Sequence, residues 1–147
     1  MQWLTPIETE VHLDRVSEPI VYLFAFQSAC PGCHSHGFPT LRSVRDMMTS
    51  DGTADQVAFV AVQTVFEDVD ENTPEAAKAS MTRYGLGDIT LGHTMGDPPA
   101  LMNDYRTGGT PWTVIVGPPP LRKVLFNDFH VDARSAVTAM QTLIDRQ

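Results

Sequence analysis

The sequence contains two cysteines, Cys30 and Cys33, separated only by Pro31 and Gly32. Two thiols at this spacing can form a disulfide with each other and exchange it with other disulfides. A stabilising cross-link is a poor explanation for them, because closing so short a loop removes little entropy from the unfolded chain. A chain of 147 residues also buries enough surface to fold without such a link. The pair therefore indicates chemistry.

The residues around the pair predict a buried strand followed by a helix. Residues 19–26 form a continuous apolar run rich in β-favouring types, typical of a central strand covered on both faces. A helix is expected from the cysteines to about Met48, with Pro39 kinking or interrupting it. The cysteines are thus expected at a junction between a strand and the amino end of a helix.

This junction predicts different roles for the two thiols. Unpaired backbone N–H groups and the helix dipole favour a thiolate at the amino end of a helix, so Cys30 is the predicted nucleophile. Pro31 suits the first helical position, where an N–H would have no intrahelical partner. Cys33, one turn later, is the predicted resolving thiol, which attacks a mixed disulfide on Cys30 and releases the substrate.

The rest of the chain alternates predicted strands and helices. Residues 85–99 are expected to be irregular, and Thr73 and Asp132 are expected to cap the helices that follow them. This order predicts an α/β sandwich with a mixed sheet. No repeat or linker divides the chain, so residues 1–147 are expected to form a single domain. Further strands are predicted at 7–13, 57–66, 112–116 and 123–126, the last two as an antiparallel hairpin, and helices at 74–84, 99–105 and 133–144.

Two motifs resemble those of the thioredoxin superfamily, most closely its TlpA-like branch of thiol–disulfide oxidoreductases. They are the apolar run that leads into Cys30-Pro31-Gly32-Cys33, and the segment 109–116, Gly-Thr-Pro-Trp-Thr-Val-Ile-Val. Over about residues 7–144, the resemblance implies a thioredoxin-like three-layer sandwich in which helices flank a mixed central sheet. It also implies an insertion between about residues 67 and 105.

The same resemblance implies a substrate-binding segment at residues 110–112. Pro111 takes the position of the cis-proline that lies against the active-site disulfide in that family. The backbone of Thr110 would then face an incoming extended peptide. Trp112 either lines the substrate groove or belongs to the core. One departure concerns proton transfer: the buried acid that thioredoxins usually carry six residues before the first cysteine is replaced by Phe24. An acidic residue of the segment 67–71 is a candidate replacement.

His34 and His36 allow other interpretations of the site. Residues 30–34 match the pattern for covalent haem attachment, but the β-rich setting argues against it. A zinc- or copper-binding module could use Cys30, Cys33 and a nearby histidine, although adjacent Cys33 and His34 are awkwardly placed to bind one ion. The histidines are otherwise expected on a solvated helix face, where a protonated His34 would favour a nearby thiolate. No metal ligand is assigned.

A thiol-dependent peroxidase on the same fold is a further alternative. Peroxiredoxin-like sites place a proline and a Thr or Ser just before the reactive cysteine, whereas this chain has only Gln27 and Ser28 there. No Gly-rich phosphate loop follows a strand, so no cofactor is expected beyond a redox-active Cys30–Cys33 disulfide. The expected partners are a protein or small-molecule disulfide or thiol as substrate, and an external reductant or oxidant.

Charge and hydropathy exclude other classes of partner. The net charge is −8 with no cluster of Lys and Arg, which argues against nucleic-acid binding. No apolar stretch approaches the ~20 residues of a membrane-spanning helix. Residues 1–10 contain no basic residue and no apolar run, so they do not form a secretory signal. The expected location is cytoplasmic, or periplasmic or otherwise extracytoplasmic if a signal has been removed.

Overall fold

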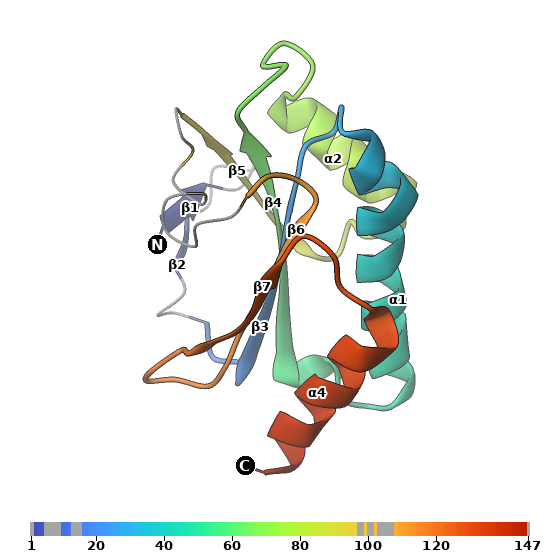
Figure 1. Ribbon diagram of the computed structural model, residues 1–147, viewed down its shortest axis with the longest axis vertical. Coiled ribbons are helices and arrows are strands. Elements are labelled where there is room, and N and C mark those ends of the chain that lie inside the picture. Colours follow the sequence, from blue (N-terminus) through green and yellow to red (C-terminus); the bar gives the residue numbers. More distant parts are fainter. Residues whose placement is uncertain are drawn as a thin grey trace.

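The residues that the structure describes form a seven-stranded mixed sheet in the order β2-β1-β5-β4-β3-β6-β7 (Figure 1). The computed structural model describes residues 2–4, 10–12, 16–96, 99, 102 and 108–146. The α/β architecture with a mixed sheet, predicted from the order of elements, is confirmed. The strands are β1 (Gln2–Leu4), β2 (Glu10–His12), β3 (Ile20–Phe26), β4 (Val57–Val65), β5 (Thr90–Met95), β6 (Trp112–Val116) and β7 (Val124–Asp128).

The longer helices of the described part of the chain pack on the same side of this sheet (Figure 1). They are α1 (Phe38–Ser50), α2 (Pro74–Arg83) and α4 (Ala133–Asp145). The predicted caps of the last two are present, because the Thr73 side chain accepts from Ala76 N and the Asp132 side chain accepts from Ser135 N. A 3₁₀ turn, Ala54–Gln56, precedes β4. Among the described residues, no helix is both long and apolar enough to cross a membrane.

Strand β3 is the centre of the core, and all seven of its residues are buried. It pairs in parallel with β4 and antiparallel with β6, so both of its edges are hydrogen-bonded. Tyr22, Phe24 and Phe26 point to the face covered by the helices, while Val21 and Leu23 join a valine-rich layer on the opposite face. Burial on both faces explains why the sequence shows a continuous apolar run instead of an alternating one.

The helix after the cysteines is divided differently from the prediction. Pro31 and Gly32 begin the helical conformation, a π-helical turn, η2, covers Cys33–Gly37, and α1 starts at Phe38. In this turn Phe38 N donates to Cys33 O, five residues back. Pro39 has no N–H to donate to the preceding turn, and it lies in the first turn of α1, where none is needed. The expected interruption is therefore present, as a wide turn before the proline.

The structure corrects two expectations. Residues 90–95, expected to be irregular, form β5, which pairs in parallel with β4 and antiparallel with β1, where His93 lies opposite Leu4. Its sequence, TLGHTM, lacks an apolar pattern, and neighbouring strands supply the stabilising hydrogen bonds. Strand β1 was also missed. Only residues 10–12 of the predicted strand 7–13, and residues 99 and 102 of the predicted helix 99–105, lie within the described residues.

Candidate active site

Both cysteines lie just beyond the carboxyl end of β3, where the chain turns into the helix. Cys30 is partly exposed, whereas Cys33 is fully buried, and both are free thiols. The backbone N–H of Cys33 donates to Cys30 Sγ over 3.3 Å. A donor from the first helical turn stabilises negative charge on Cys30 more than on a neutral thiol. Of the two sulfurs, the accessible one is therefore the one that accepts a backbone N–H of the helical turn.

The buried cysteine has a different electrostatic environment. Burial is the main cause that raises the pKa of the Cys33 thiol far above its ordinary value, and a hydrogen bond with the Cys30 side chain raises it further. Two hydrogen bonds oppose this shift in pKa, one with the Gln27 backbone and a weaker one with the Thr110 side chain. Cys33 therefore remains a protonated thiol at neutral pH in this state of the protein.

The segment before β6 lies directly against the two thiols. The Thr110–Pro111 peptide bond is cis. The Cys30 thiol donates to the carbonyl oxygen of Thr110 over 3.6 Å. Pro111 is buried, and its Cδ would lie 3.3 Å from a Cβ built on Gly32. Cys30 and Gly32 therefore lie against Thr110 and Pro111, although Cys30 and Thr110 are 80 positions apart in the chain.

Trp112 is directed away from this place. Its ring packs against the valine-rich layer on the sheet face opposite the helices, and its indole N–H donates to Asn127 Oδ1. Its backbone pairs with Ala25, whose side chain belongs to the same layer. Of the two interpretations of Trp112, the described contacts support packing against the core.

His34 is not on a solvated helix face, and that prediction was wrong. The side chain is half-buried, with Nε2 2.6 Å from the Ser28 carbonyl oxygen and Nδ1 2.8 Å from the Tyr84 hydroxyl. Because a carbonyl only accepts, Nε2 carries the proton and donates to Ser28. His34 thus ties η2 to the turn before Cys30 and to the end of α2. With both ring nitrogens engaged, it has no lone pair directed at a metal or haem iron.

His36 has a separate environment. Its ring stacks on that of His130 with centroids 4.1 Å apart, and its Nε2 lies 3.4 Å from Thr40 Oγ1. Among the described residues, no group of three or more His, Cys, Asp or Glu side chains is arranged to hold a metal ion. The geometry gives no support to the metal-binding alternative in this part of the chain.

Sequence reasoning missed a buried amide, Gln27, immediately after β3. Its Oε1 accepts from Phe66 N at 3.2 Å, Glu67 N at 3.3 Å and Asn72 Nδ2 at 3.5 Å. Its Nε2 donates to Thr110 Oγ1 and Glu67 Oε1, each at 3.3 Å. Gln27 therefore connects three segments: the turn of residues 27–30 between β3 and the helix, called the cysteine turn below, the segment at Thr110, and the loop after β4. The available signal was a polar residue ending an otherwise apolar strand.

Two further buried amides fix the backbone of the cysteine turn. Asn72 Oδ1 accepts from Ala29 N at 2.8 Å. Gln63 Oε1 accepts from Ser28 N at 2.9 Å and from Ser28 Oγ at 2.6 Å. Each side chain replaces a hydrogen bond that the turn residues cannot make within a strand or helix. The position of Cys30 is therefore held by side chains from β4 and from the loop that follows it.

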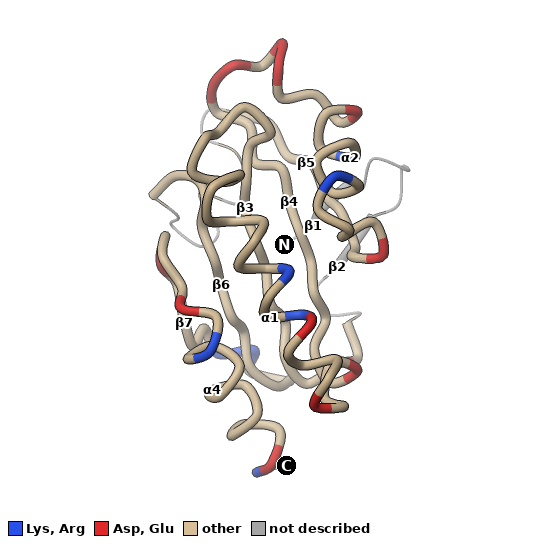
Figure 2. Tube along the Cα trace, turned by 90° about the vertical axis from the view of Figure 1, so that its right-hand side faces the viewer, with Lys and Arg blue, Asp and Glu red and all other residues tan. Residues whose placement is uncertain are grey.

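An acidic loop, residues 66–73, joins β4 to α2 near the cysteine turn (Figures 1 and 2). Its Asp and Glu side chains at 67, 68, 70 and 71 are exposed. Glu67 is linked to the site, because its Oε1 accepts from Gln27 Nε2. Phe24, at the position of the missing acid, instead packs against Phe26 and Phe38 with ring centroids 5.6 and 5.2 Å away.

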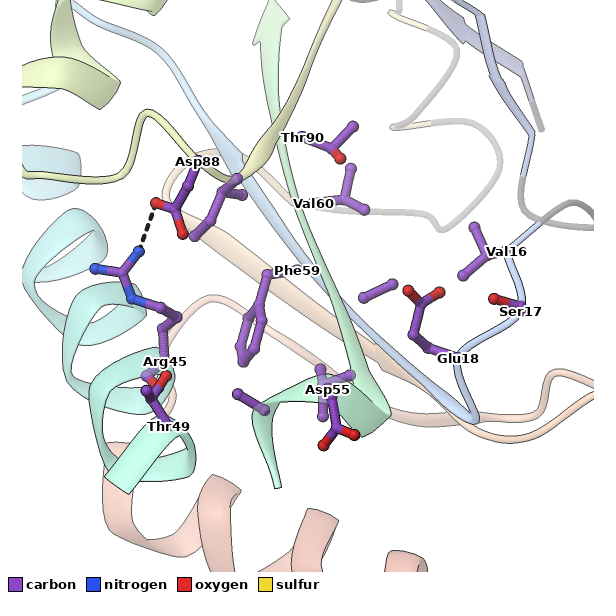
Figure 3. A pocket seen from close by; sticks show the side chains of 14 residues that line it. Val16, Ser17, Glu18, Arg45, Thr49, Asp55, Phe59, Val60, Asp88 and Thr90 are labelled. Carbon is purple, nitrogen blue, oxygen red and sulfur yellow. Dashed lines mark hydrogen bonds and ion pairs between the residues drawn. The ribbon is translucent and has the colours of Figure 1, made fainter. Parts of the chain in front are cut away.

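A pocket of about 610 Å³ lies away from the cysteines (Figure 3). Its walls include the first residues of β4 and the ion pair between Arg45 and Asp88, 2.7 Å long. The cysteines follow the carboxyl end of β3, which runs parallel to β4, so this pocket is at the opposite end of the sheet. It is separate from the thiol site.

The chain is similar to solved structures over nearly its whole length. A thioredoxin-like superfamily protein shares 25% identity and a TM-score of 0.79, covering 97% of this chain and 94% of that one. A thiol-disulfide isomerase from Corynebacterium glutamicum shares 27% identity and a TM-score of 0.72, covering 97% and 90%. A secreted Mycobacterium tuberculosis disulfide oxidoreductase has the same fold at 13% identity, with a TM-score of 0.68 and coverage of 97% and 96%.

No family model matches the sequence, and no curated protein matches it at a significant level. The assignment therefore depends on structural similarity, which covers 97% of the chain in two relatives that also share 25% and 27% sequence identity with it. These likenesses place the chain in the thioredoxin superfamily.

Proposed function

We propose that this protein is a thiol–disulfide oxidoreductase of the TlpA-like branch, with Cys30 as nucleophile and Cys33 as resolving thiol. One observation carries the proposal: the partly exposed Cys30 sulfur accepts the N–H of Cys33, whose own sulfur is buried one helical turn behind. Two solved relatives bear names that specify a thiol-disulfide isomerase and a disulfide oxidoreductase, which supports redox chemistry for this chain.

The proposed reaction has two exchange steps. The Cys30 thiolate attacks a substrate disulfide, so a Cys30–substrate bond forms and the substrate's other sulfur leaves as a thiolate. The Cys33 thiolate then attacks Cys30 Sγ, which forms the Cys30–Cys33 disulfide and breaks the bond to the substrate. The substrate gains the two electrons that the protein dithiol loses. An external reductant restores the dithiol, and with an external oxidant the same steps run in reverse.

The substrate would bind beside residues 110 and 111. The Thr110 carbonyl oxygen lies 3.6 Å from Cys30 Sγ, so backbone hydrogen bonds at Thr110 would place an extended peptide across the reactive sulfur. This recognition depends on backbone groups and is compatible with protein disulfides of varied sequence. Because the relatives include a secreted protein, the cytoplasmic location expected from sequence stays a prediction.

The other candidate activities have no comparable support. In the turn before Cys30, the Ser28 hydroxyl donates to Gln63 Oε1 and the Gln27 amide is bonded to three segments, so neither is free to bind a peroxide. A haem iron would need an imidazole nitrogen, and both nitrogens of His34 are already engaged. The thiol pair itself remains the redox centre of the proposal.

Equilibration in glutathione buffers of graded redox potential tests this function. We expect one reversible transition, in which both thiols of the chain lose their hydrogens together. Mass spectrometry after acid quenching and alkylation measures the fraction of oxidised protein at each potential. A peptide map should show the Cys30–Cys33 disulfide as the oxidised product. Reduction of insulin disulfides by the protein in the presence of dithiothreitol is the matching activity assay. A chain that forms only glutathione adducts, with no internal disulfide, would contradict the proposed mechanism.

A further inference from the structure

Strand β4 has an edge that is only partly covered at the end of the sheet away from the cysteines. Among the described strands, its neighbours are β3 and β5. Pairing with β3 includes Val57, whereas pairing with β5 begins only at Val60, which lies opposite Thr90. Over residues 57–59, no described strand therefore pairs with the edge on the β5 side. Such an edge presents backbone N–H and C=O groups that can pair with another strand.

The 610 Å³ pocket follows this edge. Its walls include all four residues of β4 from Val57 to Val60. Successive side chains of a strand point to opposite faces of the sheet, so a cavity that touches four in a row lies along the edge. Thr90, the first residue of β5, also lines it. The pocket therefore occupies the place beside β4 that β5 does not reach.

Apolar side chains line the pocket on both faces of the sheet. Phe59 belongs to the face covered by the helices, and its ring lies 5.7 Å from that of Tyr22. Ala58 and Val16 pack against the valine-rich layer on the opposite face. A strand bound at an edge directs alternate side chains to the two faces. Apolar side chains of an added strand would therefore contact protein on either side.

The charged groups of the pocket are mainly acidic. They are three carboxylates and one guanidinium, from Glu18, Asp55, Asp88 and Arg45. Arg45 is already paired with Asp88 over 2.7 Å. Among the described residues, Glu18 and Asp55 have no basic partner. In Figure 3, the Phe59 ring lies between the Arg45–Asp88 pair and these two carboxylates. A ligand that complements the pocket therefore carries positive charge.

We propose that this pocket binds an extended, basic segment of a partner protein, which adds to the edge of β4 as a short strand. Its backbone pairs with residues 57–59, and its Lys or Arg side chains reach Glu18 and Asp55. The volume lies within the range of ~300–1,000 Å³ that ligand sites have. Because the thiols lie at the other end of the sheet, the inference goes beyond the proposed function and does not depend on it.

Amide NMR spectra of the isotope-labelled protein, titrated with a capped pentapeptide of alternating lysine and valine, test the proposal. The peptide has no cysteine, so it cannot exchange with the thiols. We expect saturable shifts at residues 57–60 and at Thr90, with affinity that falls in ~0.5 M salt because the charges are screened. A peptide with glutamate in place of lysine should not bind.

A third peptide separates strand addition from simple attraction between charges. It keeps the lysines and valines but is N-methylated at every residue, so it has no backbone donors. We expect it to bind at least ~10-fold more weakly, since its hydrogen bonds to the strand edge are lost. Equal affinity of the methylated and unmethylated peptides would overturn the pairing with β4.

Matched protein variants locate the charge recognition. Glu18→Gln combined with Asp55→Asn should weaken binding by ~5-fold or more, because two ion pairs are lost. Asp70→Asn combined with Glu71→Gln removes the same charge from the exposed loop after β4, and the affinity should stay within about twofold of the wild type. Unchanged spectra away from the substituted residues establish that both variants are folded.

Three results would overturn the proposed site. The first is the absence of shifts at residues 57–60, or equal shifts with the glutamate peptide. The second is an equal loss of affinity in the two double variants, which would show general attraction to an acidic protein. The third is a change of the same amide signals on dilution without peptide, which would show that a second copy of this chain occupies the edge.

Discussion

The Cys33→Ser variant is expected to accumulate a covalent adduct with its substrate, joined through Cys30. Cys30 keeps its partial exposure and the N–H donor at residue 33, so the first attack still occurs. A serine hydroxyl cannot resolve the mixed disulfide, so the bond to Cys30 persists. With a peptide disulfide as substrate, non-reducing mass spectrometry should show close to one adduct per chain, removable by dithiothreitol.

The Cys30→Ser variant is the control for this trapping experiment. It retains Cys33, which is buried and protonated at neutral pH, and it should form no adduct with the folded protein. Its turnover in the insulin assay should fall by at least ~10³-fold, the scale of loss when a nucleophile is removed. Adduct formation at Cys33 in this variant, or turnover close to that of the wild type, would show that the two roles are assigned wrongly.

Gly37→Ala is expected to destabilise the fold by about 1–3 kcal/mol, the usual effect of overpacking a core. An added Cβ would lie 2.6 Å from Phe24 Cζ and 3.0 Å from Pro111 Cβ. Phe24 cannot move aside easily, because Phe38 packs edge-on against it at 5.2 Å. Alanine also gains up to ~1 kcal/mol of helix propensity over glycine, but we expect the steric conflict to dominate. Urea unfolding measures the difference.

Gly87→Ala is the matched control, since no atom lies within 4 Å of a Cβ at that position. It should change stability by less than about 0.5 kcal/mol. Gly37→Ala should also reduce peptide-disulfide turnover in the fraction that remains folded, because the new methyl group presses on Pro111 beside the thiols. Equal stability of the two variants would show that the packing of η2 against β3 and Pro111 is looser than described.

The sequence predicted the junction that carries the thiols because the information there is local. The apolar run of β3 and the adjacent Pro31 and Gly32 determine a buried strand and a helix start within a few residues. Thr110 and Pro111 could be linked to the cysteines only through the family resemblance, since the contact between Thr110 and Cys30 joins positions 80 residues apart.

The parts that were missed depend on contacts between distant residues. Gln27 bonds to Glu67 and Thr110 across separations of 40 and 83 positions, and no spacing rule connects them. His34 was assigned to a solvated face because Tyr84, which covers it, lies 50 positions away. Strand β5 was missed because its stability comes from pairing with β4 and β1, which its own polar sequence does not indicate.

The central claim is that one sulfur is reactive and accessible while its companion is shielded and protonated. Brief treatment of the native, reduced protein with iodoacetamide near neutral pH, followed by mass spectrometry, tests it directly. We predict that Cys30 is carbamidomethylated first and that Cys33 is modified only after denaturation or at strongly alkaline pH, because burial raises its pKa. Equal labelling of both cysteines, or faster labelling of Cys33, would contradict the account.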